Sequence, residues 1–491
     1  MQARTFLLLL QLAGLGRCLL RDDLQAAGVT AFYPGGSGYD AASQTFNRRY
    51  TFKPAAVAFP TSSRQVSDAV KAGAVNNLKV VARSGGHNYI ANGLGGKDGS
   101  LVLDLSQLKK ITFDSATNTA LIEPGNRLGD IALALNEHGR AIPHGRCTYV
   151  GVGGHAAGGG FGFISRMWGL NLDVVKAAEI VLPNGTITTV SSDQNPDLYW
   201  GIRGAASSFG IITALTFTTY PVPTSSVIFR YGWVFDIDGA TNAFESFQNF
   251  VDKGIPAELG GELVITRGPS TGRVGVEFFG AYWGPLSSFN ATVAPYLATQ
   301  PSPTSQTISS GNWLEGLEVL LYGALNTSTA PDPLDTFYAK SIMSPEAEPI
   351  TKDAARSFFT YLANEGFASN TSWFVEIELY GGSNSAINRV PFDATAFAHR
   401  DTRFNFQLYA SSSNSAPPYP ASGFTFVDGM ASSIISEMPH DWDYGAYINY
   451  PDDRLQDWER LYYGAHWSRL TALKRSVDPQ DVYGFPLSVE E

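Results

Sequence analysis

The chain has 491 residues, of which 44% are hydrophobic and only 16% are charged. This composition excludes an intrinsically disordered protein, and the length predicts two or three domains with a large core. The net charge of −11 argues against nucleic acid as a partner, because phosphates require a basic protein surface.

The N-terminus has the features of a secretory signal peptide. Arg4 supplies a positive start, residues 5–15 are largely apolar, and Gly14 and Gly16 offer a small-residue cleavage site. We therefore predict a signal peptide over residues 1–16 and a secreted, extracellular protein. No segment reaches the roughly twenty apolar residues of a membrane span, so no membrane partner is expected.

The glycosylation sequons and the cysteines are also relevant to the prediction that the protein is secreted. The four Asn-x-Ser/Thr sequons are at Asn184, Asn290, Asn326 and Asn370. The two cysteines, Cys18 and Cys147, could form a disulfide, although Cys18 lies at the edge of the predicted signal peptide. Such a pairing is impossible if Cys147 carries a cofactor.

In the first part of the chain, helical and strand patterns alternate. Ser62 or Ser63 can cap a helix whose apolar residues recur at three- and four-residue spacing. Residues 79–83 predict a buried strand that runs directly into the turn at Ser84–His87. Further strands are expected at 101–105 and 177–182, and a helix over 128–137.

Two glycine-rich segments each contain one nucleophilic side chain. Residues 83–89 carry His87 beside Gly85 and Gly86, and residues 144–160 carry Cys147 before a run of glycines. Glycines allow backbone N–H groups to approach a phosphate without interference from Cβ atoms. This combination indicates a cofactor that is held by the backbone and also attached covalently.

Residues 151–156 match the dinucleotide pattern G-x-G-x-x-A, with Asp173 about twenty residues further on. We reject an NAD site here, because no strong apolar strand precedes the pattern. We also expect the chain to remain an irregular glycine-rich segment through Gly162 instead of opening a helix.

From about Tyr220 the patterns become those of antiparallel strands, for example at 273–279 and 373–379. Segments 300–311 and 411–423 are rich in Ser and Pro and predict loops. After Tyr447 a long amphipathic helix is expected, with Leu455, Trp458, Tyr462 and Ala465 on one side, up to Asp478-Pro479.

These residues resemble the berberine bridge enzyme-like FAD-linked oxidases of the vanillyl-alcohol oxidase superfamily, most closely the fungal gluco-, chito- and xylo-oligosaccharide oxidases. The shared stretches are 144–147 with 150–160, 321–323, 398–401 and 447–450. The resemblance implies an α+β fold, a two-domain flavoprotein of the vanillyl-alcohol oxidase type. Its parts would be a PCMH-type FAD-binding domain (17–219), an antiparallel-sheet substrate domain with helices (220–440) and a C-terminal berberine-bridge segment (441–491) that returns to the FAD domain.

By resemblance, FAD is bound covalently through a ring nitrogen of His87 and the sulfur of Cys147. Further cofactor-binding positions implied by the family are Ser84, Gly85, Gly86, Asn88, Gly151, Gly153, Gly154 and Gly158. Substrate-facing positions implied in the same way are Tyr89, Tyr322, Gln407 and Tyr409. Trp313 and Phe374 are further aromatic residues that could contact a sugar.

The resemblance also implies a catalytic base at Tyr450. A phenol has an ordinary pKa near 10 and needs a proton acceptor at neutral pH. The matching acceptor in the glucooligosaccharide oxidase type is an aspartate, whereas this chain has Glu378, which is one methylene longer. We expect Tyr450 and Glu378 to act as a coupled pair.

The function that the resemblance implies is oxidation of the anomeric carbon of a reducing-end sugar to a lactone and then an aldonic acid, with dioxygen reduced to hydrogen peroxide. The expected partners are an oligosaccharide and dioxygen, and the chain is expected to act as a monomer. No metal site is predicted, because His155 and His399 lack a convincing set of further ligands. The alternatives are an FAD-linked oxidase or dehydrogenase of a secondary metabolite, and a carbohydrate-binding protein without cofactor. The sequence does not choose among the sugars.

Overall fold

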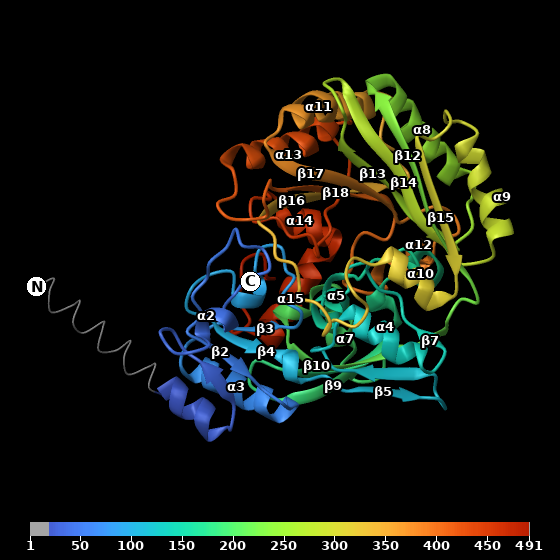
Figure 1. Cartoon of the computed structure of the whole chain (residues 1–491). Coiled ribbons are helices and arrows are strands. Elements are labelled where there is room, and N and C mark those ends of the chain that lie inside the picture. Colours follow the sequence, from blue (N-terminus) through green and yellow to red (C-terminus); the bar gives the residue numbers. More distant parts are fainter. Residues whose placement is uncertain (1–18, 491) are drawn as a thin grey trace, which may run out of the picture.

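The computed structural model describes residues 19–490. The predicted signal peptide over residues 1–16 and Cys18 lie outside these residues. The fold is α+β, as predicted, and has two main parts that face each other (Figure 1). One part contains the glycine-rich segments, and the other is a large antiparallel sheet covered by helices.

The first part contains two sheets. The four-stranded sheet has the order β1 (Thr30–Phe32), β2 (Ala56–Phe59), β4 (Leu101–Asp104) and β3 (Val80–Arg83). The five-stranded sheet has the order β5 (Ile111–Asp114), β6 (Thr119–Ile122), β10 (Ile211–Thr218), β8 (Val175–Val181) and β9 (Ile187–Ser191). The predicted strands and helix of this region are confirmed within a few residues. Its helices are α2 (Tyr39–Ala42), α3 (Ser63–Val75), α4 (Leu128–Asn136), α6 (Ser165–Trp168) and α7 (Pro196–Ala205).

The cap of α3 and the turn after β3 follow directly from the local sequence. The side chain of Ser62 accepts a hydrogen bond from the backbone N–H of Gln65, so Ser62 is the residue that caps this helix. Strand β3 ends at Arg83 and leads straight into the loop with His87. The strand end therefore fixes where this histidine lies.

The second glycine-rich segment differs from expectation. Helix α5 (Val152–Gly158) begins directly after Gly151, so the prediction that this segment would open no helix is wrong. Burial of Val152 and Ala156 in the core shared with α7 outweighs the low helix propensity of its glycines. The nine residues before Gly151 still form no strand, so no strand leads into α5 as it would in an NAD site.

The second part is a seven-stranded antiparallel sheet. Its order is β15 (Ser305–Gly311), β12 (Ser226–Asp236), β14 (Arg273–Tyr282), β13 (Leu259–Arg267), β17 (Thr371–Leu379), β18 (Thr402–Ser412) and β16 (Phe337–Pro345). Helices α8 (Ile237–Asp252), α11 (Lys352–Ala368) and α13 (Ala421–Ile435) cover its outer face, and α9 (Leu286–Leu297) packs beside them (Figure 1). The predicted inward face of β14 is confirmed, because Val274, Val276 and Phe278 are buried.

Two predictions on loops in this part need correction. Segment 300–311 is not a loop throughout, because β15 pairs with β12 at the edge of the sheet, where serine and threonine side chains tolerate exposure. In segment 411–423 the irregular stretch is short, since β18 extends to Ser412 and α13 begins at Ala421. Helices α10 (Trp313–Leu320) and α12 (Ala386–Arg389) are in the connections.

The C-terminal region forms two helices instead of the predicted long one. Helices α14 (Trp458–Tyr463) and α15 (Trp467–Val477) are separated at Gly464, whose φ of 49° interrupts the helix. Leu461 and Leu470 pack into the same core as the five-stranded sheet. Strands β7 (Arg140–Ala141) and β11 (Tyr220–Pro221) form a small separate sheet. Over residues 19–490, none of the helices has the length and apolar character needed to cross a membrane.

Candidate active site

A cavity of about 810 Å³ lies between the two glycine-rich segments and the inner face of the seven-stranded sheet. All but one of the predicted site residues line it: Ser84, Gly85, Gly86, His87, Asn88, Tyr89, Cys147, Gly151, Gly153, Gly154, Tyr322, Glu378, Gln407, Tyr409 and Tyr450. Its size is in the range of about 300–1,000 Å³ that is typical of cofactor and ligand sites. Residues far apart in the chain thus form one site.

Gly158 is the exception. It lies in α5 outside the cavity lining, and a Cβ atom there would be 2.4 Å from Oδ1 of Asn449. Its small size serves the packing of α5 against the segment that carries Tyr450. Trp313 also lies outside this cavity and is buried, whereas Phe374 lines it.

The glycine-rich wall of the cavity depends on direct backbone contact. A Cβ atom on Gly85 would lie 2.2 Å from the Gly151 nitrogen, and one on Gly151 would lie 2.1 Å from the Gly85 nitrogen. Ser84 Oγ accepts the backbone N–H of Gly153 at 3.2 Å. This surface of backbone groups fits the diphosphate of FAD, which requires close approach without side chains.

His87 and Cys147 lie together at the cavity wall. The His87 ring stacks on Phe46 with a centroid distance of 4.0 Å, and its Nε2 is 2.8 Å from Oδ2 of Asp332. Burial opposes charge on both residues, but the hydrogen bond and charge of His87 lower the pKa of the Cys147 thiol. Against the same opposing burial, Asp332 and Cys147 raise the pKa of His87. The thiol is therefore biased toward the thiolate, the form that makes bonds to carbon.

Tyr450 and Glu378 form a hydrogen-bonded pair inside the cavity. Tyr450 Oη donates to Oε1 of Glu378 at 2.9 Å, and Asn405 Nδ2 donates to Oε2 of the same carboxyl at 2.6 Å. Burial, and then the charge of Glu376, raise the pKa of Glu378 to about 8. Burial and Glu378 raise the pKa of Tyr450 well above 10. The hydrogen bond shows that glutamate, although one methylene longer than the aspartate implied by the family, reaches the phenol of Tyr450.

The Tyr89 ring stacks on the ring of Tyr450. The two rings stack with centroids 5.4 Å apart and an angle of 8° between their planes. Gln407 Nε2 donates to Tyr89 Oη at 2.5 Å, so the Tyr89 ring is itself fixed by the sheet. These contacts give Tyr450 one orientation in the cavity.

Neighbouring strands β17 and β18 place paired side chains along the cavity. Glu378 is opposite Asn405, Glu376 is opposite Gln407, and Phe374 is opposite Tyr409. The rings of Phe374 and Tyr409 stack at 4.7 Å, and Tyr409 Oη donates to Asp335 Oδ2 at 2.6 Å. Tyr322, with 51% of its surface exposed, stands at the cavity opening. An aromatic surface of this kind suits the C–H faces of a sugar ring.

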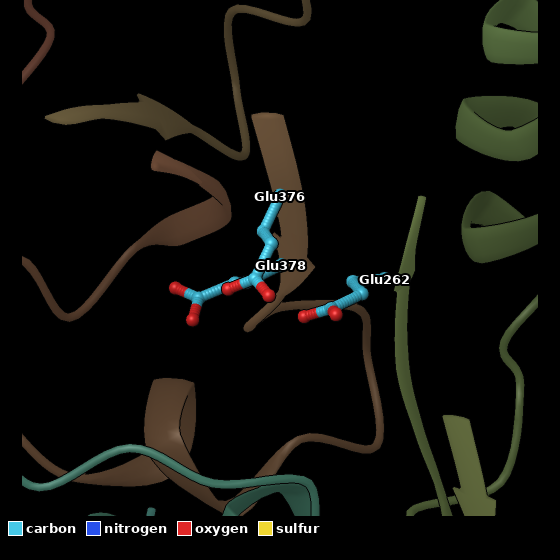
Figure 2. Close-up of side chains that lie close together, drawn as sticks. All are labelled: Glu262, Glu376 and Glu378. Atoms are coloured by element: carbon cyan, nitrogen blue, oxygen red, sulfur yellow. The ribbon is translucent and has the colours of Figure 1, made fainter. Parts of the chain in front are cut away.

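The sequence analysis missed a charged cluster beside this pair. Arg146 Nη2 lies 2.7 Å from Oε2 of Glu262 and 3.0 Å from Oε2 of Glu376, and its Nη1 donates to Tyr322 Oη at 3.3 Å. Figure 2 shows the carboxyl group of Glu376 between those of Glu262 and Glu378. Glu376 could have been found from strand alternation, because it is two residues before Glu378 and shares its face.

The same three carboxyl groups are the one set among residues 19–490 that lies close enough together to hold a metal ion, with ligand atoms within 4.8 Å of one another. The guanidinium of Arg146 already contacts two of them. Two of the carboxylate oxygens that a metal would need as ligands therefore already contact the guanidinium of Arg146.

Comparison with known proteins agrees with this geometry. The family model of the FAD binding domain matches residues 54–191, and that of berberine and berberine-like proteins matches residues 446–490. A chitooligosaccharide oxidase of Gibberella zeae is 35% identical over 95% of this chain and 93% of its own length. A carbohydrate oxidase of Microdochium nivale is 36% identical over 95% of this chain and 94% of its own length.

The solved structure of glucooligosaccharide oxidase from Acremonium strictum, which carries 6-S-cysteinyl, 8α-N1-histidyl FAD, matches with a TM-score of 0.89. It is 32% identical and covers 96% of this chain and 99% of its own. The cavity, its backbone wall and its His–Cys pair fit this cofactor. The chain therefore belongs to the berberine bridge enzyme-like family of FAD-dependent oxidases, in the group that contains the fungal carbohydrate oxidases.

Proposed function

We propose that this chain is a secreted oxidase that converts the reducing end of an oligosaccharide to a lactone, which water then opens to an aldonic acid. The observation that carries the proposal is the pair of Tyr450 and Glu378, which faces the same cavity as His87 and Cys147. A base, its proton acceptor and a covalent cofactor site thus surround one space. All four sequons lie at exposed asparagines, which supports the secretory route.

The cofactor part of the proposal is FAD attached through His87 and Cys147. Bound FAD supplies a two-electron acceptor that dioxygen can reoxidise, giving hydrogen peroxide. The remaining cofactor contacts are assigned to Ser84, Asn88 and the glycines of the cavity wall. We assign residues 17–219 and 441–491 to the cofactor part and residues 220–440 to the substrate part.

In the proposed reaction, Tyr450 Oη takes the proton of the anomeric hydroxyl. Its own proton passes to Oε1 of Glu378, which lies 2.9 Å away. Asn405 holds the second oxygen of that carboxyl, so Oε1 stays directed at the phenol. Positioned proton transfer of this kind contributes about 10²–10⁴-fold to the rate.

The sugar is held by the paired side chains of β17 and β18. The reacting ring would lie between Tyr450 and the polar pair of Glu376 and Gln407, and the next ring would lie on Phe374 and Tyr409. Tyr322 at the opening would contact the chain as it leaves the cavity. Because the aromatic pair lies beyond the polar pair on the same strands, a disaccharide or longer substrate is favoured over a monosaccharide.

The function is tested by peroxide release on a panel of glucose, cellobiose, xylobiose, chitobiose and their trimers. We expect peroxide and the matching aldonic acid with at least one oligosaccharide. Absence of peroxide with every sugar, from protein that is yellow, would favour a secondary-metabolite oxidase. Colourless protein would favour a binding protein without cofactor.

Cofactor attachment is tested by acid precipitation. In wild type and in the single variants H87A and C147S, the flavin should stay with the pellet, because one bond remains in each single variant. In the double variant it should go to the supernatant. Release of all flavin from the wild type would contradict covalent attachment.

A further inference from the structure

The charged cluster beside Tyr450 has more acid groups than its single cation can neutralise. Glu262, Glu376 and Glu378 place ligand-type oxygens within 4.8 Å of one another, and all three are buried. Arg146 is the guanidinium in contact with them, through Glu262 and Glu376. Three ionised carboxyls at this spacing would repel strongly in a site with little water, so protons must remain on some of them.

The positions of the three groups indicate which of them is charged. Glu262 is 0% exposed, and its Oε1 has no hydrogen-bond partner in the described structure. Burial raises its pKa well above the ordinary value and so favours the protonated form of Glu262. Glu376 lines the cavity and contacts Arg146 at 3.0 Å. Of the two carboxyl partners of Arg146, Glu376 is the one that reaches the cavity, so we place the negative charge on it.

Glu378 faces this charge along its own strand. Glu376 and Glu378 are two residues apart on β17, so their side chains are on the same face, and Glu262 on β13 is the register partner of Glu378. Among the charged groups that act on Glu378, Glu376 has the larger effect and raises its pKa, whereas Arg146 lowers it. The phenols that are coupled electrostatically to it are Tyr89, Tyr380, Tyr447 and Tyr450.

We propose that Glu376, fixed in its charged form by Arg146, is a positioning residue that keeps a proton on Glu378 and so sets the pH at which Tyr450 gains its proton acceptor. Below that pH, Glu378 is protonated and cannot take the phenol's proton. Above it, Glu378 is an ionised carboxylate whose high proton affinity suits it to accept a proton from a phenol. The kinetic test of this inference requires the proposed function, whereas the inference itself does not.

The kinetic test compares pH profiles of kcat/KM for wild type and E376Q. Wild-type activity should rise with pH up to about 8, the value to which burial and Glu376 raise the pKa of Glu378. In E376Q, which keeps the shape but removes the charge, this acidic limb should move down by about one pH unit. Relative to its own maximum, E376Q should then be about tenfold more active than wild type well below the limb.

Three further variants make the test specific. E376D keeps the charge, so the acidic limb of its kcat/KM profile should lie close to the wild-type pH. E262Q mimics the neutral form that burial favours for Glu262, so it should leave the acidic limb of the profile in place. E277Q changes another glutamate of the same sheet, which pairs with Arg230 at 2.5 Å outside the cavity lining, and should also leave the limb in place.

A second measurement needs no turnover. The infrared C=O band of protonated Glu378, assigned by its loss in E378Q, should titrate about one pH unit lower in E376Q than in wild type. An unmoved band in E376Q, or an equal shift in E262Q, would overturn the proposal. A shifted band in an enzyme that oxidises no sugar would keep it and overturn only the proposed function.

Discussion

The two walls of the cavity are built in opposite ways. The glycine-rich wall brings backbone to backbone, with Gly85 and Gly151 so close that neither has room for a Cβ atom. The sheet wall presents side chains in register, with Glu378, Glu376 and Phe374 each opposite a partner on β18. At Gly85 and Gly151 the first wall should tolerate no added atom. Substitutions in the second wall should change the chemistry of the site and leave the fold intact.

The largest effect is expected from G151A. A Cβ atom at this position would meet the Gly85 nitrogen at 2.1 Å and Ser84 Oγ at 2.3 Å, so the two glycine-rich segments must separate. We expect a loss of stability of about 3 kcal/mol or more, together with loss of bound flavin. Thermal unfolding and the visible absorbance of the purified protein measure both effects.

G154A is the matched control for this wall. Gly154 also lines the cavity, but a Cβ atom there would have no neighbour within 4 Å. Its melting temperature should match that of wild type. Equal melting temperatures for G151A and wild type would show that close backbone contact is not needed there.

The next largest effect is expected from Y450F in the sheet-facing pair. The variant removes the hydroxyl that is hydrogen-bonded to Glu378 but keeps the ring that stacks on Tyr89. We expect kcat to fall by about 10²–10⁴-fold, with flavin content and melting temperature nearly unchanged. Stopped-flow reduction of the flavin by the best sugar measures this step, and unchanged reduction would remove Tyr450 from the mechanism.

The effect expected from E378Q is a change in how stability depends on pH. Burial and Glu376 raise the pKa of Glu378 from the ordinary 4.5 to about 8, so the folded state binds its proton more tightly than the unfolded state. Stability from this group is fully present below pH 4.5 and is lost as the pH rises through about 8. The wild type should therefore lose on the order of 3–5 kcal/mol relative to E378Q between pH 4.5 and 9.

Denaturant unfolding of both proteins at pH 4.5 and pH 9 measures this contribution together with its coupling to neighbouring groups, because the two chains differ at this residue alone. A difference between wild type and E378Q that does not change with pH would show that Glu378 has an ordinary proton affinity in the folded protein.

The smallest effect is expected from F374A at the outer end of the sheet wall. The ring stacks on Tyr409 and offers a face for a sugar beyond the reacting one. Its loss should raise KM for trisaccharides by about three- to tenfold, since stacking of this type contributes about 1 kcal/mol, with kcat nearly unchanged. An equal change for a monosaccharide would place Phe374 at the reacting ring instead.

Local patterns were sufficient for much of the fold. The cap at Ser62, the alternation of Val274, Val276 and Phe278, and the strand that ends at Arg83 each depend on a few neighbouring residues, and the structure confirms them. Helix α5 and strand β15 were missed for the opposite reason. Burial against α7 and pairing with β12 decide their conformation against local propensity.

The residues of the candidate site also fall into those that local sequence indicates and those that only tertiary contacts bring together. The amino-acid sequence by itself determined the two nucleophiles, His87 and Cys147, and the glycines beside them, because each set is contiguous in the chain. Only the tertiary structure decided that Arg146 contacts Glu262 and Glu376, since these residues come from three distant segments. Their charges depend on burial and on distances of a few ångströms, and no local spacing in the chain contains that information.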